Sequence, residues 1–242
     1  MSYDLSIEEY IARQPEYDKW RGILHPLLRA AVPAICKVDV QGLQNVPRQG
    51  RTCLMINHVS YLDPIVVTAS IPFRHTVSLS KVENFAIPVA GWLLRRWGHF
   101  PIHRGDYDRK ALLQTIALLQ SEQLVLMAPE GTRHSGGLQP GKDGLAYITT
   151  KADAVIVPAA ICGAEDWRRR LKRFRRAYAK VVFGAPFRFR KGGSKHIPRA
   201  VLSAMIAEAM YQLALTIPDD FRYLRGFYSD IENASTEHLE FV

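Results

Sequence analysis

Two side chains that can act together as a base follow one predicted strand. His58 and Asp63 have four residues between them and come directly after the apolar run 52–56, which predicts a buried strand. An imidazole, with an ordinary pKa near 6.5, accepts a proton at neutral pH. A carboxylate bonded to its other nitrogen fixes the tautomer and stabilises the protonated ring. The pair therefore predicts a base that activates a hydroxyl, although the spacing alone also suits a hydrogen-bonded histidine beside a helix-capping aspartate.

A second group of polar residues follows another predicted strand. Glu130, Gly131, Thr132 and Arg133 come after the apolar run 124–128. Gly131 permits a tight turn, so Arg133 and nearby backbone N–H groups can converge on a phosphate. Glu130 can orient the arginine or a polar group of a substrate. An ordinary charged turn is the alternative interpretation of this segment.

Two further segments have weaker signals. Arg104 follows the apolar run 100–102 and precedes a glycine, which suits a second phosphate ligand, whereas the adjacent His103 is interpreted as incidental. The segment 157–161 is apolar and has no reactive group, so it can only shape a pocket or pack in the core.

In this order, the four segments resemble the motifs of the glycerolipid acyltransferases, also called the lysophospholipid or phosphate acyltransferase family. The matching residues, motif by motif, are Asn57, His58 and Asp63; Phe100, Ile102 and Arg104; Glu130 to Arg133; and Val157 with Pro158. Lys81 resembles a lysine that often precedes the second motif. The resemblance extends from about Val40 to Ile161. Pro101, inside the second motif, is a departure that affects the identity of the acceptor more than the type of reaction.

The resemblance implies a direct acyl transfer. His58 would be the general base and Asp63 its orienting partner, with Ser60 structural and backbone N–H groups at the start of the next helix stabilising the oxyanion. A fatty acyl chain would pass from acyl-CoA or acyl-carrier protein to a hydroxyl of lysophosphatidic acid, giving phosphatidic acid for phospholipid biosynthesis. No metal or cofactor is implied. The expected substrate-binding residues are Lys81, Arg104, Glu130, Gly131, Thr132 and Arg133. A lyso-aminolipid or another lysophospholipid is the alternative acceptor.

The elements that must position these residues form an α/β pattern. Short strand-like runs are expected at 37–41, 52–56, 75–80, 100–103, 124–128, 154–161 (broken by Pro158), 180–183 and 187–189, the last two as a hairpin. Helices are expected at 63–70, 85–97, 106–121 and 197–216, and a glycine-rich loop at 131–144. The alternation predicts a single α/β domain with a mixed, partly parallel sheet flanked by helices.

An N-terminal helical segment precedes this domain. Residues 1–36 are expected to be helical with a break near Gln14 and Pro15, and residues 37–242 to form the catalytic domain. An apolar face on the second helix, flanked by Lys19, Arg21 and Arg29, suits either docking on the domain or contact with a membrane interface. The face comprises Trp20, Ile23, Leu24, Leu27, Leu28 and Ala31.

Composition narrows the class of protein. The net charge of +9 over 242 residues favours anionic partners, and the clusters 92–97 and 168–176 combine basic with apolar residues. We therefore expect a peripheral or monotopic protein on the cytoplasmic face of an anionic membrane. A basic nucleic-acid-binding protein is the alternative of another class, but no nucleic-acid-binding signature is found, so nucleic acid is not expected. The three cysteines suggest neither a zinc site nor a disulfide framework.

Overall fold

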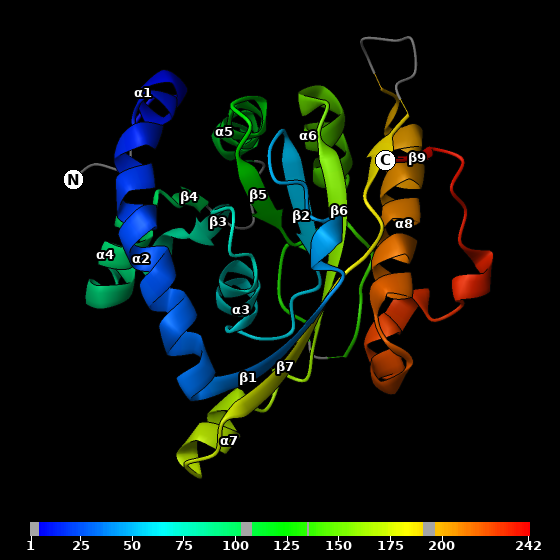
Figure 1. The fold of residues 1–242 in the computed structure, drawn as a ribbon. Coiled ribbons are helices and arrows are strands. Elements are labelled where there is room, and N and C mark those ends of the chain that lie inside the picture. The colour runs from blue at the N-terminus through cyan, green and yellow to red at the C-terminus, as the bar shows by residue number, and fades with distance from the viewer. Residues whose placement is uncertain (1–4, 103–107, 135, 191–196) are drawn as a thin grey trace.

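A nine-stranded mixed sheet forms the centre of the molecule (Figure 1). The computed structural model describes residues 5–102, 108–134, 136–190 and 197–242. Five neighbouring strands of this sheet are parallel, and their order is β6-β2-β5-β3-β4. Their bounds are β2 Thr52–Ile56, β3 Thr76–Lys81, β4 Phe100–Ile102, β5 Leu124–Met127 and β6 Val155–Cys162. The predicted mixed, partly parallel sheet is confirmed.

The parallel strands are buried on both faces. In β2, Cys53 and Met55 pack into one apolar cluster, while Leu54 and Ile56 pack into the other. This alternation follows from the period of two in a strand, and it explains why a strand covered on both sides has a continuous apolar sequence. The carboxyl ends of β2, β3, β5 and β6 therefore lie along one edge, where ligands of open α/β sheets usually bind.

Helices cover the two faces (Figure 1). The first cluster includes residues of α5 Arg109–Gln120, α6 Gly144–Ala152 and α8 Arg199–Thr216. The second includes residues of α3 Asp63–Ser70 and of the N-terminal helix α2 Gln14–Ile35. α6 was not predicted: no element was assigned between the glycine-rich loop 131–144 and the strand expected at 154–161.

Two of the strand predictions are wrong. β7 Ala177–Phe183 and β8 Phe187–Phe189 form no hairpin, because both pair antiparallel with the same edge of β6. Beyond them lie β1 Cys36–Gln41, parallel to β7, and β9 Leu239–Phe241, antiparallel to β8. β6 is also not broken at Pro158. This proline, which lacks an N–H, lies opposite the gap between β7 and β8, where its carbonyl accepts the N–H of Gly184 at 2.8 Å.

The N-terminal segment is helical, with the expected break. α1 Ile7–Ala12 ends at Arg13, and α2 follows directly. Its buried residues are Gln14, Arg21, His25 and Val32, whereas Ile23 and Leu27 are 57% and 61% exposed. Ile23 and Leu27 therefore do not mediate docking, whereas Leu28 of the same face packs against the second core cluster. Arg21 is not a flanking surface charge, because it is fully buried and its Nε donates to the carbonyl oxygen of Trp97 at 2.7 Å.

α2 packs beside α4 Pro88–Trp97 (Figure 1). The remaining elements are short: α7 Trp167–Lys172 and 3-10 segments at Leu43–Asn45, Val82–Ala86, Asp219–Tyr228 and Ile231–Asn233. None of the helices in the described ranges is long and apolar enough to cross a membrane. The predicted division between residues 1–36 and 37–242 stays a prediction.

Candidate active site

The predicted pair lies at the carboxyl end of β2. Nδ1 of His58 is 3.0 Å from Oδ2 of Asp63, which is the first residue of α3. The Asp63 side chain is completely buried, while the His58 side chain is 14% exposed. With Nδ1 held by the carboxylate, Nε2 is the nitrogen that remains for a substrate hydroxyl. The geometry has the form of a base with its orienting acid.

Asp63 also holds the loop that bears His58. Its Oδ2 accepts the backbone N–H groups of Val59 and Ser60 at 2.8 and 2.6 Å, and its Oδ1 has no hydrogen-bond partner within the described ranges. Burial raises the pKa of Asp63, and the hydrogen bonds from His58 and Ser60 oppose this rise. The carboxylate thus fixes the backbone and the imidazole together.

These contacts limit which backbone N–H groups could stabilise an oxyanion, and the expectation that those at the start of α3 do so stays a prediction. The N–H groups of Val59 and Ser60 already donate to Asp63, and that of Leu62 donates to the Ser60 hydroxyl at 3.2 Å. They are therefore not free to bind a developing oxyanion. Ser60 is buried, and its hydroxyl caps this turn, as expected for a structural residue.

Asn57 fixes the end of β2 to its neighbour β6. Its side-chain Nδ2 donates to the carbonyl oxygen of Ile161 at 2.9 Å, and its Oδ1 accepts the N–H of Ile161 at 2.7 Å. The asparagine is buried, so both amide groups satisfy a buried backbone. This residue links the first motif to the strand that contains the fourth.

The loop after β5 holds His58 from the other side. The N–H of His134 donates to the His58 carbonyl oxygen at 3.0 Å, and the Glu130 carboxylate accepts the N–H of His58. Glu130 also accepts the N–H of Gln139 at 3.1 Å and is only 5% exposed. The two motifs are therefore one hydrogen-bonded unit, and Glu130 is directed at backbone groups of this unit.

Burial raises the pKa of Glu130 from its ordinary value of 4.5 to about 7. Between these values the folded chain holds one proton more than the unfolded chain, so this residue makes stability fall as pH rises. The free energy of unfolding should fall by up to about 1.4 kcal/mol per pH unit in this window because of Glu130. We expect Glu130→Gln, which cannot ionise, to remove this fall. Urea unfolding at pH 5, 6 and 7, with exposed Glu83→Gln as control, measures the difference. If the free energy of unfolding depends on pH equally in the wild type and in Glu130→Gln, the prediction is wrong.

Several cations gather beside the pair. The Arg133 guanidinium stacks on the Tyr61 ring at 3.3 Å from its centroid, and that of Arg168 lies 5.1 Å from the same centroid. A side-chain hydrogen bond with Arg133 lowers the pKa of Tyr61 most strongly, and the charges of Arg168 and Lys81 add to this effect. The charges of Lys81 and Arg133 thus both act on Tyr61. Arg104 lies outside the described residues, as does His103.

Sequence motifs missed Tyr61 and assigned Arg168 only to a basic cluster. Tyr61 occupies one of the four positions between His58 and Asp63, where the motif specifies no side chain, and Arg168 belongs to α7 after β6. A tyrosine inside the motif and the first arginine after the fourth motif were the only available signals.

The remaining motif residues shape the loop. Gly131 has φ of +74°, a backbone conformation that favours glycine, while the nearest group to a Cβ atom there would be the flexible end of Lys142. Thr132 is exposed. The far end of the loop rests on the 3-10 segment 219–228, where Leu138 donates to the Leu224 carbonyl oxygen at 2.9 Å. This C-terminal support was not predicted.

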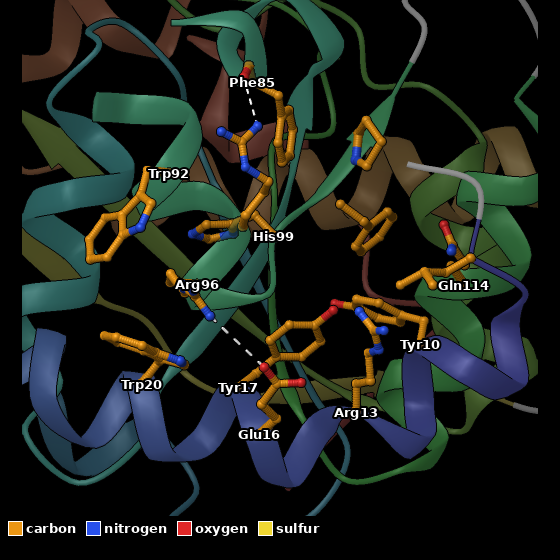
Figure 2. Close-up of a pocket in the computed structure, with 14 residues that line it drawn as sticks. Tyr10, Arg13, Glu16, Tyr17, Trp20, Phe85, Trp92, Arg96, His99 and Gln114 are labelled. Atoms are coloured by element: carbon orange, nitrogen blue, oxygen red, sulfur yellow. Dashed lines mark hydrogen bonds and ion pairs between the residues drawn. The ribbon is translucent and has the colours of Figure 1, made fainter. Parts of the chain in front are cut away.

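A separate cavity of about 220 Å³ lies between the N-terminal helices and the α4–β4 region (Figure 2). Tyr10 and Tyr17 line one side, and Trp92 and His99 line another. Arg96 points between the helices, with its guanidinium 4.7 Å from the Trp20 ring and an Nη1 atom 4.0 Å from Glu16. The cavity continues to Pro101 in β4, just before the segment that contains Arg104. Across the described part of the chain, no group of three or more potential metal ligands is found.

Comparisons with known proteins agree with the motifs. A model of the acyltransferase family matches residues 37–162, just over half of the chain. The chain is 31% identical over 156 residues to the chloroplastic 1-acyl-sn-glycerol-3-phosphate acyltransferase BAT2 of Brassica napus, covering 61% of this chain and 45% of the relative. It is 26% identical over 175 residues to the 1-acyl-sn-glycerol-3-phosphate acyltransferase of Bacillus subtilis, covering 72% and 85%.

The chain spans less than half the length of the Brassica relative. A solved structure, that of the 1-acyl-sn-glycerophosphate acyltransferase PlsC from Thermotoga maritima, aligns with a TM-score of 0.55. The two chains are 19% identical, and the alignment covers 82% of this chain and 78% of that one. The likeness shows a shared fold.

Proposed function

The chain belongs to the acyltransferase family, and on this premise we propose that it transfers a fatty acyl group from a thioester to a hydroxyl of a lysophospholipid. The observation that carries the proposal is the 3.0 Å contact between Nδ1 of His58 and the buried Asp63. It leaves Nε2 as a base at an edge where a substrate can approach.

This geometry supports the following reaction. Nε2 of His58 takes the proton of the acceptor hydroxyl while the hydroxyl oxygen bonds to the thioester carbonyl carbon. The C–S bond then breaks, and the protonated imidazole returns the proton to the thiolate that leaves. Asp63 stabilises the imidazolium in between. The residues perform this transfer without a cofactor.

We propose lysophosphatidic acid as the acceptor and acyl-CoA or acyl-carrier protein as the donor. Support for the acceptor comes from the names of the Brassica and Bacillus relatives and from the cations Lys81, Arg133 and Arg168 beside the pair. A guanidinium binds phosphate oxygens in a bidentate manner. Phosphatidic acid would be the product, as in phospholipid biosynthesis.

An assay in detergent micelles tests the proposal. Labelled palmitoyl-CoA is supplied with lysophosphatidic acid, and formation of labelled phosphatidic acid is the expected result. Parallel reactions use palmitoyl-acyl-carrier protein as donor, or lysophosphatidylglycerol and a lyso-aminolipid as acceptors. If transfer occurs only to a different acceptor, that acceptor replaces lysophosphatidic acid in the proposal. Absence of transfer in every combination would reject the proposed function.

We further propose that the α2–α4 surface binds an anionic membrane at the cytoplasmic face. Ile23 and Leu27 of α2 and Val89 and Trp92 of α4 are exposed by 57%, 61%, 72% and 43%. The two helices pack together, with the Trp20 and Trp92 rings 5.7 Å apart and Arg96 between them (Figure 2). Apolar groups flanked by aromatic and basic ones suit a lipid interface. Trp97 takes no part, because it is buried and donates to the Thr76 carbonyl oxygen.

Replacing Ile23 and Leu27 together by serine is expected to weaken binding to phosphatidylglycerol-containing vesicles at least about tenfold, because both side chains lose apolar burial. Vesicle co-sedimentation measures the partition, and circular dichroism checks the fold. Leu215→Ser is the control, since Leu215 is 46% exposed on α8, away from this surface. Unchanged partition of the double variant would show that this surface does not contact lipid.

A further inference from the structure

Two arginines from different elements share one exposed tyrosine. Arg133 stacks on Tyr61 at 3.3 Å, and Arg168 lies 5.1 Å from the same ring centroid and 5.2 Å from that of Trp167. Tyr61 is 55% exposed. Cation–π contacts thus hold both guanidiniums beside a ring that is three residues from His58.

The elements that bear these residues end at the same edge of the sheet. Tyr61 follows β2, Arg133 follows β5, Arg168 follows β6, and Lys81 is the last residue of β3. These four strands are parallel neighbours in the order β6-β2-β5-β3. The cations therefore arrive from both sides of the His58 loop, and their gathering is a property of the topology.

Carboxylates do not account for the gathering. In the described parts of the chain, Lys81, Arg133 and Arg168 form no ion pair, whereas the next arginine, Arg169, pairs with Asp166. Like charges held close together at an open edge repel one another, and a bound anion removes this repulsion. The charges thus form a binding site for an anion beside the proposed base.

Resting on the proposed function, we propose that Arg168 joins Arg133 in binding the phosphomonoester of the acceptor, with Tyr61 positioning both guanidiniums. A phosphomonoester has a second pKa near 6 and is largely dianionic at neutral pH. A phosphodiester carries one negative charge and has one oxygen fewer for these donors. Arg168 is therefore a specificity-determining residue that favours a lysophosphomonoester over a lysophosphodiester.

The test compares two arginines of one helix. Arg168→Gln and Arg169→Gln each remove one positive charge from α7, but only the first touches Tyr61. We expect Arg168→Gln to lower kcat/KM for lysophosphatidic acid about tenfold, mostly through KM, and to leave lysophosphatidylglycerol nearly unchanged. Arg168→Lys should recover part of the loss, because it restores charge without the planar donors. Arg169→Gln should resemble wild type.

Tyr61 variants separate positioning from charge. Tyr61→Phe keeps the ring face and should retain most of the preference, whereas Tyr61→Ala releases both guanidiniums and should lose it with no change in net charge. Equal losses in Arg168→Gln and Arg169→Gln, or an unchanged preference in Tyr61→Ala, would overturn the assignment.

The donor also carries phosphates, so palmitoyl-pantetheine, which lacks those of CoA, is used beside palmitoyl-CoA. A defect of Arg168→Gln seen only with palmitoyl-CoA would assign Arg168 to the donor and overturn the proposal. Binding of lysophosphatidic acid without donor, measured by calorimetry, separates the site from the reaction. Binding that depends on Arg168 without any acyl transfer would reject the proposed function but support the phosphate site. Acyl transfer with binding that does not depend on Arg168 would support the function but reject the phosphate site.

Discussion

Replacing His58 by alanine is expected to lower kcat for acyl transfer by about a thousandfold while the protein stays folded. In the proposed mechanism the imidazole is the base, and general-base catalysis contributes on the order of 10² to 10⁴ to a rate. Substrate binding should change little, because the cations proposed to hold the phosphate lie on other residues. Single-turnover transfer of labelled palmitate measures the effect independently of product release.

The matched control for this variant is His134→Ala. His134 donates its backbone N–H to the His58 carbonyl oxygen at 3.0 Å, and alanine keeps that group. Its rate should stay within a few-fold of wild type, by analogy with ordinary surface substitutions. A His58→Ala enzyme as fast as His134→Ala would show that another group accepts the proton.

Replacing Asp63 by asparagine is expected to be nearly as damaging as losing the imidazole. Oδ2 of Asp63 accepts the N–H groups of Val59 and Ser60 at 2.8 and 2.6 Å and also lies 3.0 Å from Nδ1 of His58. An asparagine oxygen in that position keeps the three contacts but has no charge to stabilise the imidazolium, whereas an amide nitrogen there donates to Nδ1 and leaves the ring proton on Nε2. The base is weaker in the first case and in the wrong tautomer in the second, and the corresponding replacement costs about 10⁴ in rate in serine proteases.

Two measurements check this second result. Nitrogen-15 chemical shifts of His58 report which ring nitrogen bears the proton, and kcat is measured on the same sample. Asp39→Asn, in the edge strand β1, is the control for loss of a carboxylate. A wild-type tautomer and wild-type rate in Asp63→Asn would remove Asp63 from the mechanism and leave it as a capping residue.

The two expected losses have a common structural origin. The His58 ring is fixed by Asp63, its backbone by Glu130 and His134, and the preceding Asn57 by Ile161. β2 lies between β5 and β6, so each of its neighbours in the sheet contributes one of these supports. A base that is held in this way needs little reorganisation when it takes a proton.

Local patterns determined most of the sheet and the chemistry. The apolar runs of β2 and β5, followed at once by His58 and by Glu130, predicted two strand ends with polar side chains, and both were found at the same edge. The pattern is local because alternation in a buried strand and the turn that ends it depend on neighbouring residues only. The family resemblance rests on the same short segments.

Only the tertiary structure decided which groups meet. The hairpin expected at 180–189 was wrong because strand pairing is a long-range choice, here made by β6. On α2 the buried line includes Arg21 and His25 while Ile23 and Leu27 are exposed, because Trp97 and Thr68 offer carbonyl partners to the polar pair. Periodicity shows that a helix has two faces, but the partner determines which one is covered.

The proposed anion site likewise depends partly on local sequence and partly on tertiary structure. From the sequence, Glu130 and Arg133 were alike candidates for binding substrate. In the fold Glu130 turns to backbone N–H groups, and Arg133 turns outward to Tyr61 and Arg168. Tyr61 and Arg168 are more than 100 positions apart in the sequence. The sequence by itself thus determined the position of the His58–Asp63 pair at a strand end, whereas the parallel order of β6, β2, β5 and β3 decided which distant residues lie near it.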